Sequence, residues 1–147
     1  MSERESIAFH EVLGHRIAAV THEPDQPSGR VVVMAHGFRS SKIGPSRYFV
    51  PLARALVVRG IAAFRFDQPG SGDSSGDFDD SSFATWIDTI EHFARQSIEA
   101  GNDVALLGQS VGRHRDACRS RSFRRRDPRR RAVESGADAE LRRQPHR

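Results

Sequence analysis

The chain has 147 residues, enough for one domain of ordinary size. Its charge divides unevenly: residues 1–112 carry 10 basic and 14 acidic side chains (net −4), whereas residues 113–147 carry 13 arginines and 5 acidic side chains (net +8). The single cysteine, Cys118, excludes an internal disulfide, and no apolar run reaches the roughly 18 residues of a membrane span.

The N-terminal segment predicts a pair of strands and no signal peptide. Residues 1–12 are charged and lack an apolar core, so we expect a cytoplasmic protein. Residues 6–24 contain two short apolar stretches around Gly14, which predict a β-hairpin or a pair of edge strands. Turn-forming residues follow at 24–29.

Three continuous apolar runs then predict strands that are buried on both faces, at residues 30–37, 61–67 and 102–108. Between them, apolar residues at helical spacing predict two helices, at residues 45–60 and 81–101. We expect the first helix to begin near residues 48–50, because Pro51 fits only in a first turn, and Ser81 or Ser82 to cap the second. This order predicts an α/β fold with a mostly parallel sheet and helices on both faces.

A serine motif follows the third predicted buried strand. Gly108-Gln109-Ser110-Val111-Gly112 matches G-x-S-x-G, which in this context is typical of a sharp strand-to-helix turn that exposes a nucleophilic serine. An ordinary Gly/Ser turn is the alternative. We therefore treat Ser110 as the candidate catalytic nucleophile.

A serine nucleophile needs N–H donors for the developing oxyanion. The sequence offers the backbone of Phe38, in the loop after the first buried strand, and the backbone of Val111. His36 precedes that loop and has two interpretations, a general base or a structural histidine that holds the turn, of which we favour the second.

The segments "VVVMAHGF", "AAFRFDQPGSGDSSGDF" and "VALLGQSVG" together resemble the N-terminal half of an α/β-hydrolase, most closely the serine-aminopeptidase-like and cinnamoyl (feruloyl) esterase group. The resemblance covers about residues 6–112. It implies that Ser110 is the nucleophile, that Phe38 and Val111 form the oxyanion hole, and that Asp67 is structural. It further implies a small-molecule acyl substrate and no metal or organic cofactor.

The loop at 68–80 contains an acidic run that could suggest a metal site, but solvated, flexible carboxylates are the preferred interpretation: Asp73, Asp77, Asp79 and Asp80.

The resemblance ends after Gly112. The family's triad acid and base follow the serine on later strands, and we assign neither role to any residue of the tail: His114, Asp116, Asp127, Glu134, Asp138, Glu140 and His146. We therefore divide the chain into an α/β-hydrolase part, residues 1–112, and an arginine-rich tail, residues 113–147, which we expect to be disordered. We therefore expect the chain to be truncated after the nucleophile elbow and to have little or no activity.

A one-base frame error near Gly112 would explain this change of character. Residues 113–118, read one base later with CGN arginine codons, allow Gly-Ile-Val-Thr-Leu-Ala, a helix start of the kind the family uses. The alternative function is a non-enzymatic module whose arginines at 124–126 and 129–131 bind nucleic acid, although only Phe123 lies near enough to stack on a base.

Overall fold

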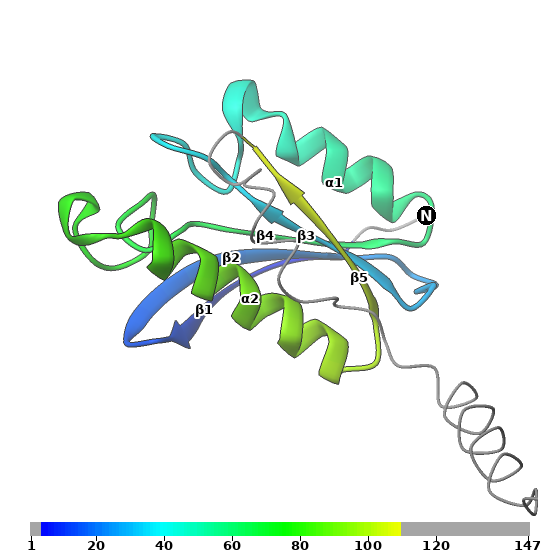
Figure 1. Cartoon of the computed structure of the whole chain (residues 1–147). Coiled ribbons are helices and arrows are strands. Elements are labelled where there is room, and N and C mark those ends of the chain that lie inside the picture. Colours follow the sequence, from blue (N-terminus) through cyan, green and yellow to red (C-terminus); the bar gives the residue numbers. More distant parts are fainter. Residues whose placement is uncertain (1–3, 110–147) are drawn as a thin grey trace, which may run out of the picture.

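The structure is a computed structural model, and it describes residues 4–109. Its centre is a five-stranded mixed sheet with the strand order β1-β2-β4-β3-β5 (Figure 1). The strands are β1 (Arg4–Val12), β2 (His15–Glu23), β3 (Arg30–Ala35), β4 (Ala62–Phe66) and β5 (Asp103–Gly108). The α-helices within these residues are α1 (Phe49–Val57) and α2 (Phe83–Glu99), and short 3-10 turns occupy Pro45–Arg47 and Phe78–Asp80.

The first two strands form the predicted hairpin. Val12 pairs with His15 across a two-residue turn, in which Leu13 (φ 50°) and Gly14 (φ 81°) both have left-handed backbone conformations. The alternative of two edge strands is wrong, because β2 also pairs antiparallel with β4, Ala19 opposite Phe66. β2 suits this inner position because its residues 17–20 are buried.

The three predicted strands lie side by side and parallel. The prediction of burial on both faces is wrong for β5, whose residues are exposed or only partly buried. β3 pairs with β4 on one side and with β5 on the other, so that Ala35 lies opposite both Phe66 and Gly108. The carboxyl ends of the three strands are therefore level. Ligand sites of open α/β sheets form at the carboxyl ends of the strands, which are called the carboxyl edge below.

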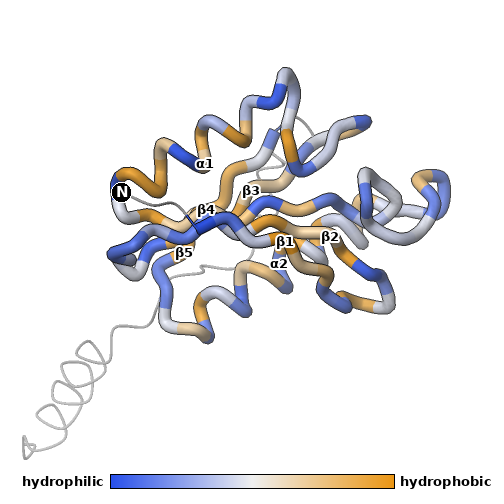
Figure 2. The backbone as a smooth tube through the Cα atoms, turned by 180° about the vertical axis from the view of Figure 1, so that it is seen from behind, coloured by the Kyte–Doolittle hydropathy of each residue, from blue (hydrophilic) through white to orange (hydrophobic). Residues whose placement is uncertain are grey.

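One helix covers each face of the sheet, as expected (Figure 1). Phe49 and Ala53 of α1 pack on Met34 and Ala63, while Phe93 of α2 packs against the other face. The Phe93 ring lies 4.7 Å from that of Phe64 and 4.8 Å from that of Phe66, centroid to centroid. The hydropathy colouring shows these apolar stretches in the strands and the mixed character of the helices (Figure 2).

The helix starts follow the predicted signals. Pro51 lies in the first turn of α1, where its missing N–H costs no helical hydrogen bond. Ser82 caps α2, its side chain accepting a hydrogen bond from the Thr85 N–H. Within residues 4–109, neither helix has the length and apolar character needed to cross a membrane.

Candidate active site

The predicted serine turn begins beside the predicted oxyanion loop. The Gln109 N–H donates a hydrogen bond to the Ala35 carbonyl (3.2 Å), which extends the parallel pairing of β5 with β3 by one residue. Phe38 lies in the turn after β3 and is 58% exposed. Ser110 and Val111, the other candidate site residues, lie outside the described part of the chain.

His36 is buried at the end of β3, and both of its ring nitrogens are engaged. Nε2 accepts a hydrogen bond from the Gln68 N–H (2.9 Å), so Nδ1 carries the proton and donates to the Gly37 carbonyl (2.9 Å). Burial lowers the pKa of His36, although the Gly37 carbonyl and the Asp67 charge act in the opposite direction. A ring nitrogen that already accepts a backbone proton has no lone pair for a serine hydroxyl. The structural interpretation of His36 is therefore confirmed.

Asp67, directly after β4, is the most heavily bonded carboxylate of this region. It is fully buried and accepts hydrogen bonds from the Lys42 N–H (2.6 Å), the Lys42 ammonium (2.5 Å) and the Asp73 N–H (2.9 Å). The Lys42 Nζ also contacts the Asp73 carboxylate at 2.6 Å. Asp67 thus has the structural role that the family resemblance implies, joining the loop after β3 to the loop after β4.

The charges of this cluster stabilise one another. Burial disfavours the Lys42 ammonium, but its hydrogen bonds to Asp67 and Asp73 outweigh that cost and raise the pKa of Lys42. The hydrogen bond from Lys42 lowers the pKa of the Asp73 carboxyl. No pattern in the sequence predicted these contacts of Lys42, the only lysine of the chain.

The loop after β4 is also fastened to β2. The Ser74 hydroxyl donates to the Asp67 carbonyl (2.8 Å) and accepts from the Ala18 N–H (2.9 Å), and the Ser75 N–H donates to the Arg16 carbonyl (2.9 Å). Asp73 is exposed, as the interpretation of the acidic run as solvated predicts, but it is also ion-paired with Lys42, which that interpretation did not include.

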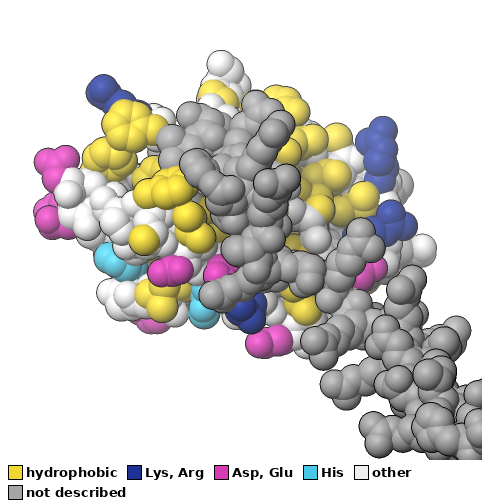
Figure 3. Space-filling model, viewed as in Figure 1, with side chains coloured by type: hydrophobic (Ala, Val, Ile, Leu, Met, Phe, Trp, Pro, Cys, Tyr) yellow, Lys and Arg dark blue, Asp and Glu magenta, His cyan; other side chains and the backbone are white. Residues whose placement is uncertain are grey.

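Three other acidic residues of this run are exposed: Asp77, Asp79 and Asp80. In Figure 3, acidic side chains project from the end of the molecule where Figure 1 places this loop. Within residues 4–109 no three His, Cys, Asp or Glu side chains are grouped as metal ligands would be.

A cavity of about 510 Å³ opens between the two loops at the carboxyl edge. The Phe38 and Phe78 rings form one corner, edge to face with centroids 5.1 Å apart. The other lining residues are small or polar: Arg39, Ser40, Gly70, Ser71 and Gly72. The cavity therefore offers an aromatic surface next to the Phe38 backbone.

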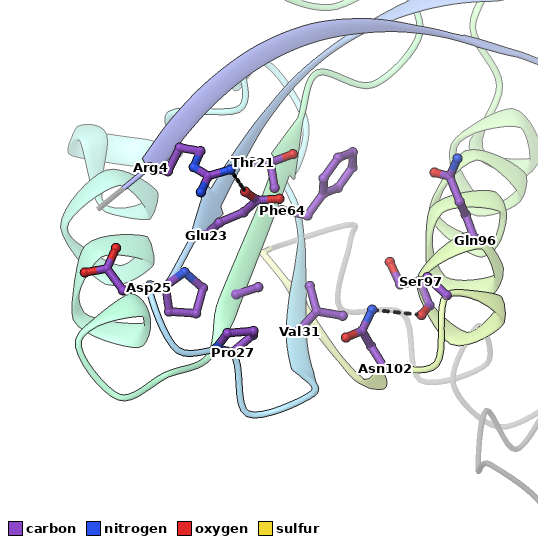
Figure 4. A pocket seen from close by; sticks show the side chains of 13 residues that line it. Arg4, Thr21, Glu23, Asp25, Pro27, Val31, Phe64, Gln96, Ser97 and Asn102 are labelled. Atoms are coloured by element: carbon purple, nitrogen blue, oxygen red, sulfur yellow. Dashed lines mark hydrogen bonds and ion pairs between the residues drawn. The ribbon is translucent and has the colours of Figure 1, made fainter. Parts of the chain in front are cut away.

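A second pocket, of about 470 Å³, lies at the opposite edge of the sheet, near the amino ends of β3 and β4 (Figure 4). Val31, Ala62 and Phe64 form its apolar part, and an Arg4–Glu23 ion pair (3.6 Å) lies on its rim. Its position separates it from the loops that carry the predicted chemistry.

The family model described as serine aminopeptidase, S33, matches residues 26–114, more than half of the chain. The chain therefore belongs to this family, and its sheet is that of the α/β-hydrolase superfamily. A search of curated proteins found no match.

Solved structures share this fold. Est1E from Butyrivibrio proteoclasticus, solved with ferulic acid bound, is 23% identical with a TM-score of 0.64, covering 71% of this chain and 43% of its own. The α/β hydrolase GrgF from Penicillium sp. sh18 is 20% identical with a TM-score of 0.64, covering 74% and 38%. A cold-adapted esterase from an Arctic intertidal metagenomic library is 27% identical with a TM-score of 0.58, covering 76% and 53%. The chain thus spans about half or less of the length of these structures.

The remaining predictions concern residues outside the described range. These are the tail at 113–147 with its arginine clusters, the frame error near Gly112, and the histidines and carboxylates considered for a triad.

Proposed function

We propose that this chain carries the nucleophile half of a serine hydrolase that cleaves small-molecule esters. Ser110 is the nucleophile, and the N–H groups of Phe38 and Val111 stabilise the oxyanion. The observation that carries this proposal is the hydrogen bond from Gln109 to Ala35, together with the pairing of Gly108 with Ala35. It brings the residue before Ser110 beside the strand that leads into the Phe38 loop.

In the proposed reaction, the Ser110 Oγ attacks the ester carbonyl carbon while a base takes the hydroxyl proton. The carbonyl oxygen becomes an oxyanion that accepts hydrogen bonds from the two N–H groups. Collapse of this intermediate breaks the bond to the leaving oxygen, which takes up the proton and departs as the alcohol. Water then releases the acid from the acyl-serine.

Within residues 4–109, the histidine that the sequence offers as a candidate base is already occupied. His36 is the histidine nearest the predicted oxyanion donor in sequence, and its hydrogen bonds to Gln68 and Gly37 occupy both nitrogens. We therefore propose that the chain as given turns over esters very slowly, and that a downstream Asp–His pair supplies the base in an intact relative.

The cavity between the loops favours a substrate ester that has an apolar or aromatic group. Phe38 and Phe78 present exposed rings there, and the related Est1E was solved with ferulic acid bound. The related Arctic protein is described as an esterase.

Acylation of Ser110 tests the proposal without requiring rapid turnover. The chain is incubated with p-nitrophenyl butyrate and with imidazole, which acts as an added base, and the masses of the intact protein and of its Ser110 peptide are measured by mass spectrometry. We expect one butyryl group on Ser110, absent from Ser110→Ala and retained in Ser28→Ala, a control at the other edge of the sheet.

A butyryl group on other residues only, or none, would contradict the role of Ser110. Rapid release of p-nitrophenol without imidazole, abolished by Ser110→Ala, would confirm the nucleophile and contradict the proposed inactivity.

A further inference from the structure

We propose that Lys42 is a positioning residue of the oxyanion hole: its ammonium, held between Asp67 and Asp73, fixes the loop that presents the Phe38 N–H. This inference rests on the proposed function and adds a residue to it. Lys42 does not touch the reacting atoms and acts only through the loop.

The loop after β3 is held on both sides of Phe38. Before Phe38, the His36 ring accepts a hydrogen bond from the Gln68 N–H; after it, both nitrogens of Lys42 bond to the Asp67 carboxylate. The two anchors therefore bind consecutive residues at the carboxyl end of β4. A loop fixed at two points only six residues apart leaves the intervening backbone little freedom.

The backbone of Lys42 is held at its carbonyl as well. The Arg65 Nη1 donates to the Lys42 carbonyl at 3.4 Å. Arg65 is itself buried, and it also donates to His22 Nε2 (2.9 Å) and to the Glu5 carboxylate (2.8 Å). The Lys42 carbonyl is thus held by a side chain of the sheet, that of Arg65 in β4.

The cluster of Lys42, Asp67 and Asp73 depends on the positive charge of the Lys42 ammonium. The Asp67 carboxylate is fully buried, and the Lys42 side chain is only 14% exposed, so removing the ammonium leaves a buried negative charge without its counter-charge. An arginine carries the same charge as a planar fork and does not reproduce a single nitrogen that bridges two carboxylates. The chain uses arginine at 22 positions and lysine only here.

The test compares Lys42→Met, Lys42→Arg and the exposed control Arg59→Met in the full chain. Hydrogen exchange followed by mass spectrometry measures the amides at 38–41, and the imidazole-assisted reaction measures the rate constant and ester concentration dependence of Ser110 acylation. We expect Lys42→Met to raise the rate of hydrogen exchange at 38–41 about 10-fold or more. The acylation rate constant at saturating ester should fall about 10-fold or more. The half-saturating ester concentration should change by less than about 3-fold. Lys42→Arg should recover part of both effects, and Arg59→Met should match the wild type.

A second variant covers the case in which Lys42→Met does not fold. Asp73→Asn keeps the buried Lys42–Asp67 pair and removes only the negative charge at position 73, where the Asp73 side chain is 71% exposed. We expect both readouts to change in the same directions but by smaller factors.

Unchanged exchange at 38–41, or faster exchange with an unchanged acylation rate constant, would overturn the role of Lys42. Failure of the wild-type chain to form any acyl-Ser110 would instead reject the proposed function.

Discussion

His36 illustrates how hydrogen bonding decides what a single residue can do. Its place beside Phe38 suits a general base, yet the Gln68 N–H occupies Nε2 and the Gly37 carbonyl receives the Nδ1 proton. The neutral ring is therefore a structural brace for the loop. Its edge-to-face contact with Trp86, with centroids 5.6 Å apart, links the same brace to α2.

This arrangement predicts a loss of stability in mild acid. Burial lowers the pKa of His36 below its ordinary 6.5, so the unfolded chain binds a proton there before the folded chain does. The free energy of unfolding should fall as the pH drops below about 6.5, by up to about 1.4 kcal/mol per pH unit for this one group. Urea unfolding between pH 7.5 and 5 measures it.

The His36→Gln variant should show a weaker pH dependence than the wild type. Some dependence will remain, because burial also lowers the pKa of His10. An NMR titration that placed the His36 pKa above 6.5 would contradict the explanation.

At the scale of elements, the strands and helices were predicted closely from the sequence, whereas the loop after β4 was not. Continuous apolar runs indicated β3, β4 and β5, and Ser82 and Pro51 indicated where the helices begin. The order of the loop depends on residues far away in the chain, since Asp67 binds Lys42 and Ser74 binds Ala18. No local pattern reports such contacts, which is why the ion pair of Asp73 with Lys42 was not predicted.

The loop after β4 also depends on a close approach at Gly72. Its φ is +55°, and a Cβ added there would lie 2.3 Å from a carboxylate oxygen of Asp67. Gly72→Ala should therefore lower the free energy of unfolding by clearly more than the roughly 1 kcal/mol of backbone strain alone. Thermal or urea unfolding checks this.

Gly29→Ala is the matched control, because Gly29 has a φ of +73° and open space where its Cβ would be. Equal losses for the two variants would show that contact with Asp67 adds nothing.

At the scale of the whole molecule, the sheet aligns parts of the site that are far apart in the sequence. The parallel register of β4, β3 and β5 places the loops at 36–44 and 67–77 and the last residue of β5, Gly108, at one end of the sheet. The fold and the position of the Phe38 loop followed from the sequence and its family resemblance. The contacts between Lys42 and Asp67 that join the first two loops could be identified only from the structure.

The most direct measurement is a crystal structure of the chain after reaction with diethyl p-nitrophenyl phosphate in the presence of imidazole, which leaves a diethylphosphoryl group as a mimic of the tetrahedral intermediate. We expect the phosphoryl group on Ser110 Oγ, with one of its oxygens about 2.7–3.1 Å from the Phe38 nitrogen. A Ser110 hydroxyl that is buried, unmodified, or directed away from the loop after β3 would contradict it.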